Sequence, residues 1–271
     1  MVRRVASCSV DPSVRAGFGL RLTLWAQLMA DDGIELFIGL IESIDTPGAV
    51  DVCRGLLSVD EQIRADRFKF ERHQRQYVFA HAMLRLALSH AAPEVEPTDW
   101  SFSTGRYGRP FVAAPTTATP LHFSLSHADG CVACVVSKHE TVGVDVETVS
   151  RRVAPLSTAL RFFAPEEVET LRTLPEPAAI ERFFDYWTLK EAYLKARGFG
   201  LNLPLDAFAM QVSREAIKIT FKPDIADDPA GWRFSLCSPS PSHRLAIADG
   251  SGAAGGLRIT RNAWPLQDAA E

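Results

Sequence analysis

A glutamate occupies a position where a buried apolar residue would be expected, within residues 187–195 (WTLKEAYLK). The spacing of Phe183, Trp187 and Leu194 predicts one long helix with an apolar face. Glu191 falls in the middle of that face, and a buried carboxylate costs free energy unless it is paired, protonated or bound to a metal ion. Glu191 is therefore a candidate ligand or base.

Lys195 follows Glu191 by one helical turn and lies at the edge of the same face. Glu191 and Lys195 could form an ordinary surface pair, worth a few tenths of a kcal/mol. The place of Glu191 on the apolar face argues against that interpretation.

Two more carboxylates, Asp145 and Glu147, lie in the short predicted strand over 141–147 (TVGVDVE). Because they are two residues apart, both project from one face of the strand while the valines point to the other. Two adjacent carboxylates repel each other, and on an apolar strand such a pair suits a divalent cation with oxygen ligands. For this pair alone, a solvated edge strand is the simpler interpretation.

The overall composition is that of an ordinary globular protein. The chain has 271 residues, 46% of them hydrophobic, with a net charge of −4, so no global nucleic-acid-binding field is expected. Five scattered cysteines indicate a reducing compartment, and no apolar run reaches transmembrane length, so we expect a cytoplasmic protein. Residues 1–33 are expected to be an N-terminal extension ahead of the folded body, and such an extension can be disordered.

The hydrophobic patterns predict a mixed α and β chain. Strands are predicted over 34–43, 121–126, 131–137, 141–147, 209–212, 216–221, 232–236 and 245–249. Helices are predicted over 61–89 and in the region between 162 and Gly198, a glycine placed to end a helix. Residues 101–110 form a predicted turn or hairpin, and 148–160 a flexible connection.

The helix predicted over 61–89 begins with Ser58 and Glu61 in the form of a capping box. Its first part is rich in cations, namely Arg64, Arg67, Lys69, Arg72 and Arg75. Composition alone favours a solvated face here, and an anion-binding site is the alternative.

Cys131 and Cys134 lie in one predicted strand and must point to its opposite faces. No second cysteine pair exists to complete a zinc site, so both are read as small buried apolar residues.

The motifs occur in an order that resembles the signature of the 4′-phosphopantetheinyl transferases, in particular the longer, Sfp-type branch. Residues 143–147 (GVDVE) are followed about forty residues later by 187–195 (WTLKEAYLK). Three further stretches agree with that branch: 64–85, which contains 67–70 (RFKF), 107–110 (YGRP) and 124–127 (SLSH). The resemblance covers roughly residues 34–249, and the sequence departs from it at Glu61, where some relatives carry a basic residue.

The resemblance implies an α+β fold with two pseudo-symmetric halves and the active site in the cleft between them. The N-terminal half would span 34–140 and contribute the coenzyme A-binding part. The C-terminal half would span 141–250 and contribute the metal site and the catalytic helix, followed by a tail over 251–271.

The resemblance also implies an activity, that of a holo-[carrier protein] synthase. Such enzymes transfer the 4′-phosphopantetheine arm of coenzyme A to a serine of an apo acyl, peptidyl or polyketide carrier protein and release 3′,5′-ADP. A Mg²⁺ ion would be held by Asp145, Glu147 and Glu191. Lys190 and Lys195 would contact phosphate oxygens.

Further roles are implied by the same resemblance. Either Glu191 or a metal-bound water, together with Glu167, would deprotonate the carrier serine. Coenzyme A would contact Arg64, Arg109, Ser126 and His127 at its 3′-phosphate and adenylate end. The loop 148–160, with Arg151 and Arg152, would dock the carrier, and we expect a monomer. The alternatives are a non-catalytic coenzyme A or carrier-binding module and a metal-dependent phosphohydrolase.

Overall fold

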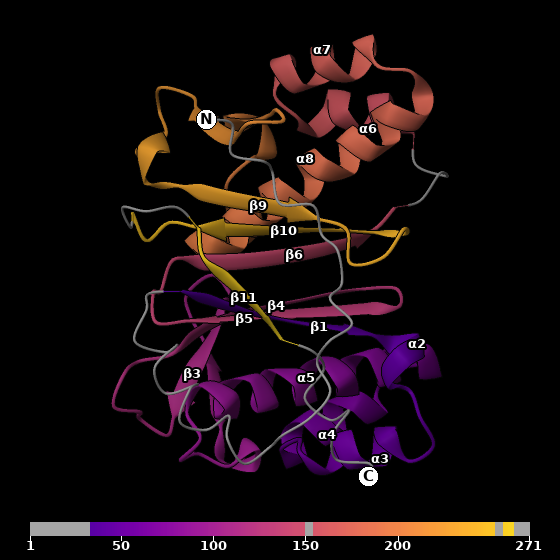
Figure 1. Cartoon of the computed structure of the whole chain (residues 1–271), viewed down its shortest axis with the longest axis vertical. Coiled ribbons are helices and arrows are strands. Elements are labelled where there is room, and N and C mark those ends of the chain that lie inside the picture. Colours follow the sequence, from indigo (N-terminus) through magenta and orange to yellow (C-terminus); the bar gives the residue numbers. More distant parts are fainter. Residues whose placement is uncertain (1–32, 150–153, 253–256, 263–271) are drawn as a thin grey trace.

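Two β-sheets pack face to face, and each carries a long helix on its outer face (Figure 1). This computed structural model describes residues 33–149, 154–252 and 257–262. The extension predicted over residues 1–33 lies almost entirely outside these ranges, as do Arg151 and Arg152. None of the helices in the described ranges combines the length and the apolar composition needed to cross a bilayer.

The two runs of secondary structure follow one another along the chain. The first contains β1 (Ile34–Leu40), α2 (Ile41–Ile44), α3 (Ala49–Gly55), α4 (Val59–Asp66), α5 (Glu71–Ala91), η1 (Pro97–Asp99), β2 (Ser101–Thr104), β3 (Pro110–Ala114), β4 (His122–Ala128) and β5 (Cys131–Ser137). The second contains β6 (Val142–Thr148), α6 (Pro155–Phe162), α7 (Pro165–Thr173), α8 (Glu176–Arg197), η2 (Gly200–Asn202), η3 (Leu205–Ala207), β7 (Phe208–Val212), β8 (Ile217–Phe221), η4 (Pro229–Gly231), β9 (Arg233–Cys237) and β10 (His243–Asp249), and β11 (Ile259–Asn262) follows.

The same connection pattern occurs in both runs. In the first, the strand order β1-β5-β4 is antiparallel throughout, and in the second the order β6-β10-β9 is likewise antiparallel. Each run has a long helix after its first strand and a two-stranded hairpin after that helix, β2-β3 or β7-β8. The predicted α+β fold class is confirmed. Superposition of the two halves, and a domain boundary near residue 140, stay predictions.

Two segments differ from the sequence-based expectation. Residues 148–160 do not form one flexible connection, because α6 begins at Pro155, whose fixed φ suits the first turn of a helix. Within the expected tail 251–271, β11 pairs in parallel with β1, with Ile34 opposite Ile259. A strand of four residues that joins an edge from the far end of the chain has little periodicity of its own to predict it.

Strand alternation distributes side chains between three apolar layers. On β5, Cys131 packs between the two sheets while Cys134 packs beneath α5, which confirms that the two cysteines point to opposite faces. On β6, Val144 and Val146 pack between the sheets. The intervening residue, Asp145, therefore projects toward α8, which covers the other face of β6.

Gly143 permits the close approach of β6 and α8. A Cβ atom at this position would lie 2.1 Å from the carbonyl oxygen of Ala192 and 2.6 Å from the backbone nitrogen of Ala196. Both clashing atoms belong to the backbone of a packed helix, so neither can move aside as a flexible side chain could. The spacing between the strand carboxylates and α8 therefore depends on glycine.

We expect Gly143→Ala to lower the free energy of unfolding by about 3 kcal/mol, because α8 must be displaced from β6. Urea unfolding followed by far-ultraviolet circular dichroism would measure the change. Gly55→Ala is the matched control, since no atom lies within 4 Å of its added Cβ and it ends α3. Equal stability of the two variants would show that the close contact does not constrain the helix.

Candidate active site

A polar seam joins β4 to β6. The Ser124 hydroxyl accepts a hydrogen bond from the backbone N–H of Val144 at 3.1 Å, and the Ser126 hydroxyl accepts one from Val146 at 3.2 Å. Both serines are buried and both alternate with β4 residues that face the other way. In the described chain, no strand pairs with this edge of β6. The two serine hydroxyls therefore accept the hydrogen bonds of its backbone N–H groups.

Ser126 also connects this seam to two charged groups. Its hydroxyl donates to Asp145 Oδ1 at 2.9 Å and accepts from Lys195 Nζ at 2.8 Å. The same Lys195 ammonium donates to Asp145 Oδ1 at 2.7 Å. Asp145 is 4% exposed, and its second oxygen, Oδ2, is buried with no hydrogen-bond partner. A carboxylate oxygen in that condition is an acceptor available to a cation.

Glu147 and Glu191 lie close enough to Asp145 to feel its charge. Burial, together with repulsion from Asp145, raises the pKa of Glu147 to about 7, although the Trp187 indole N–H donates to Glu147 Oε1 at 3.2 Å. Burial and the Asp145 charge also raise the pKa of Glu191, while Lys195 lowers it. Three carboxylates from one strand and one helix therefore share a single electrostatic environment.

These carboxylates fit an oxygen-ligated cation that keeps some of its water. In the described ranges no cage of three or more His, Cys, Asp or Glu side chains that could hold a metal ion is found. Mg²⁺ does not require such a cage, because it is commonly held by one or two carboxylates, several waters and substrate phosphates. The unpartnered Asp145 Oδ2 and the mutual repulsion of the acids are what a bound cation would relieve.

Lys190 and Glu167 lie apart from this cluster. The Lys190 ammonium is fully buried and donates to Glu167 Oε2 at 2.8 Å and to the carbonyl oxygens of Leu205 and Phe208. Glu167, also buried, accepts from the backbone N–H of Met210. Neither group is free to meet a phosphate or a serine, so the structure contradicts the phosphate contact expected of Lys190 and the proton transfer expected of Glu167. Both residues instead hold α8 against its neighbours.

Arg109 has backbone partners where a coenzyme A contact was expected. Its guanidinium donates to the carbonyl oxygens of Ala196 at 2.8 Å, Glu140 at 2.5 Å and Val142 at 3.3 Å. This arginine therefore ties the turn after β2 to the last turn of α8, which ends at Gly198 in the left-handed conformation, as predicted. A contact between Arg109 and coenzyme A stays a prediction.

His127 and Arg64 line two cavities that share Phe68. His127 borders a cavity of about 440 Å³ and accepts a hydrogen bond from Gln76 Nε2 at 3.1 Å. Desolvation and the Lys195 charge lower the pKa of His127. Arg64 and Arg67 border the second cavity, of about 640 Å³. The sequence signals for these cavities were the cation-rich segment around residue 64, where composition alone favoured a solvated face, and the 124–127 (SLSH) motif that contains His127.

Gln76 and Tyr77 also line the cavity beside His127. Both lie on α5, and the resemblance gave neither of them a role there. Helical periodicity indicates which side chains pack against the core. It cannot tell a side chain that only packs there from one that also lines a cavity.

We expect Ser126→Ala to cost more stability than Ser124→Ala. Each removes the acceptor for one buried N–H, worth about 1–3 kcal/mol, but only Ser126 also holds Asp145 and Lys195. The difference between their free energies of unfolding, measured in urea, should be about 1 kcal/mol or more. Equal losses would mean that the Ser126 hydroxyl does no more than satisfy the backbone.

Comparison with known proteins finds relatives of the region that contains this site. The model of the 4′-phosphopantetheinyl transferase superfamily matches residues 141–248. The 4′-phosphopantetheinyl transferase HetI of Nostoc sp. is 39% identical over 145 residues, which cover 54% of this chain and 61% of that protein. A 4′-phosphopantetheinyl transferase of Bacillus subtilis is 27% identical over 202 residues, covering 72% of this chain and 87% of that protein.

Among solved structures, the holo-[acyl-carrier-protein] synthase of Thermotoga maritima is similar, with 25% identity and a TM-score of 0.33. The match covers 40% of this chain and 61% of the Thermotoga protein. A TM-score this low adds nothing to the description of the fold above. The matched region 141–248 contains Asp145, Glu147, Glu191 and Lys195. In this region the chain is similar to the 4′-phosphopantetheinyl transferases, and its match spans 61% of the length of HetI.

Proposed function

We propose that this protein transfers the 4′-phosphopantetheine arm of coenzyme A to a serine of an apo acyl or peptidyl carrier protein and releases 3′,5′-ADP. The observation that carries the proposal is the convergence of Lys195 and Asp145 on Ser126, with Glu147 and Glu191 nearby. The attacked group is a pyrophosphate, so the site must mainly neutralise and align charge.

In the proposed reaction, the hydroxyl oxygen of the carrier serine attacks the phosphorus that bears the pantetheine arm. The bond from that phosphorus to the oxygen of the departing 3′,5′-ADP breaks. Lys195 would hold a positive charge against the phosphate oxygens, since its ammonium already lies at the Asp145 carboxylate. Glu191, whose pKa is raised by burial and by Asp145, would accept the serine proton.

Asp145, Glu147 and Glu191 would hold Mg²⁺ in this proposal. When bound, the ion supplies charge neutralisation at the pyrophosphate. The protein's own contribution is to fix the acids: Ser126 and Lys195 orient Asp145 through Oδ1, and the Trp187 indole orients Glu147. Arg64 and His127 would meet the anionic end of coenzyme A from the two cavities beside Phe68.

The carrier protein would dock against α6. This helix exposes Leu156, Leu160 and Phe162, and Arg161 lies in its last turn. An apolar surface with an added positive charge suits carrier helices, which are usually acidic. The docking role proposed for residues 148–160 therefore extends to Phe162. We also propose that the enzyme is a monomer and is cytoplasmic.

Incubation with Mg²⁺, coenzyme A and an apo carrier protein should add the mass of one phosphopantetheine group to the carrier, as measured by intact-mass spectrometry. A panel of fatty-acid, polyketide, nonribosomal-peptide and lysine-biosynthetic carriers would identify the preferred partner. Binding of coenzyme A without any adduct would favour a non-catalytic module. Cleavage of coenzyme A without an adduct would favour a phosphohydrolase.

Glu191→Gln should reduce the rate of transfer by about 10²–10⁴-fold, because it removes both a cation ligand and the proposed base. The melting temperature should not fall, since loss of this charge relieves repulsion by Asp145. Glu176→Gln at the exposed start of α8 is the matched control and should keep the wild-type rate. Unchanged turnover in Glu191→Gln would remove this residue from the chemistry.

A further inference from the structure

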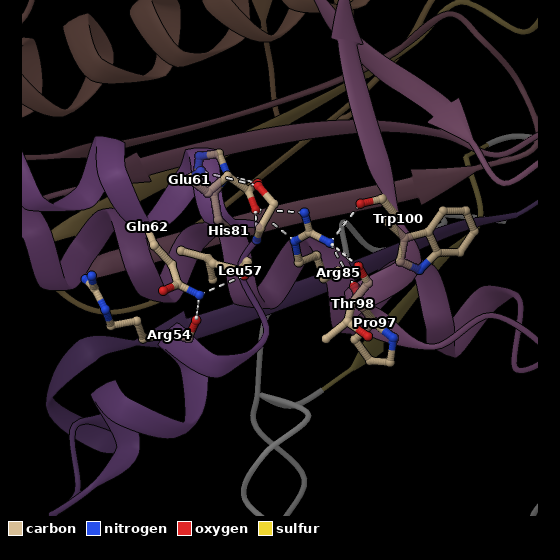
Figure 2. Close-up of polar contacts among 10 residues, drawn as sticks. Arg54, Leu57, Glu61, Gln62, His81, Arg85, Pro97, Thr98 and Trp100 are labelled. Carbon is tan, nitrogen blue, oxygen red and sulfur yellow. Dashed lines mark hydrogen bonds and ion pairs between the residues drawn. The ribbon is translucent and has the colours of Figure 1, made fainter.

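The carboxylate of Glu61 is hydrogen-bonded to Ser58, His81 and Arg85, and both of its oxygens are used (Figure 2). Its Oε2 accepts from the Ser58 backbone N–H at 2.8 Å and from Arg85 Nη2 at 2.7 Å and Nε at 3.0 Å. Its Oε1 pairs with His81 Nδ1 at 2.8 Å. A carboxylate occupied in this way is not a contact for an anionic ligand, which it would also repel.

Arg85 anchors this network in the interior. Its side chain is 1% exposed, and Nη1 donates to the carbonyl oxygens of Pro97 at 2.9 Å and Trp100 at 2.8 Å. Burial alone would raise the pKa of Glu61, but His81, Ser58 and Arg85 together lower it to about 2. Glu61 is therefore an anion at neutral pH, and its position is set by a buried cation on α5.

His81, which is bonded to Glu61, packs against Tyr77. The two rings pack in a tilted arrangement, with their centroids 4.0 Å apart at an interplanar angle of 31°. Tyr77 in turn packs at 5.3 Å from the Phe68 ring, and the Arg64 guanidinium lies over Tyr77 at 5.8 Å. The contacts thus run without a break from Glu61 to the side chains that border the two cavities.

Tyr77 and Phe68 pack together and form an aromatic wall beside those cavities. Phe68 borders both, Tyr77 borders the one that contains His127, and Arg64 borders the other. A displaced Tyr77 ring would release Phe68 and Arg64 together, since both rest against it. The shape of the region that would receive the anionic end of coenzyme A therefore depends on that ring.

We infer that Glu61, acting through His81, is a positioning residue that fixes Tyr77 and thereby sets the affinity for coenzyme A. The inference rests on the proposed function. Glu61 is not itself a ligand contact. It aligns the aromatic wall against which Arg64 packs.

The test uses the full chain with tyrosine labelled at Cζ with ¹³C, which gives four tyrosine signals, and Tyr77→Phe assigns the relevant one. His81→Phe keeps a ring over Tyr77 but removes its bond to Glu61, and leaves the Glu61–Arg85 pair intact. Glu61→Gln removes the charge. Glu71→Gln, at an exposed carboxylate at the start of α5, is the matched control.

We expect His81→Phe and Glu61→Gln to move the Tyr77 resonance and to raise KM for coenzyme A about tenfold, with kcat within about twofold of wild type. Glu71→Gln should change neither. An unmoved Tyr77 signal in His81→Phe would overturn the inference, and so would a moved signal with an unchanged KM. Glu61→Gln unpairs a buried arginine, so if that variant does not fold, His81→Phe alone decides.

The Tyr77 measurement needs no substrate, so it separates this inference from the proposed function. If the wild-type protein transfers no phosphopantetheine, the proposed function fails, and the dissociation constant for coenzyme A from calorimetry replaces KM. A tenfold weaker dissociation constant in His81→Phe would then support the inference. An unchanged constant, or no binding by the wild-type protein, would overturn it.

Discussion

The structure depends on how the unpaired backbone edge of β6 is satisfied. A buried N–H without a partner costs about 1–3 kcal/mol, and here serine hydroxyls of β4 supply the acceptors at Val144 and Val146. A hydroxyl, unlike a strand carbonyl, can also donate. Ser126 uses that proton on Asp145, so one side chain both joins the two sheets and orients the acid on the strand.

Helix α8 must then present its charges at that same point. Gly143 permits the helix backbone to lie directly against β6, and the buried Lys190–Glu167 pair fixes the rotation of the helix about its axis. A buried ion pair adds little net stability, but leaving either partner alone in the core is costly. Such a pair therefore selects one orientation of α8, the one in which Glu191 and Lys195 face Asp145.

Patterns of neighbouring residues in the sequence predicted strand positions and the face to which each strand residue points. Strand β5 spans the predicted residues 131–137, and strand alternation correctly placed Asp145 on the face opposite Val144 and Val146, although a solvated edge was the simpler interpretation for the acid pair alone. The partners of Lys190 and Arg109 could not be predicted in this way. Arg109 bonds to a carbonyl 87 residues away, and nothing in the sequence near a turn arginine distinguishes a ligand contact from a contact with distant backbone.

Glu61 shows why a correct local reading can still be incomplete. Its spacing from Ser58 predicted a capping box, and the structure confirms one at the start of α4. A cap uses only part of a carboxylate's capacity to accept hydrogen bonds, and the remainder goes to Arg85, 24 residues on, and to His81. An acid that caps one helix and neutralises a buried cation on the next fixes both helices together. A cavity wall held in this way would need less ordering when a ligand binds, which would reduce the entropic cost of binding.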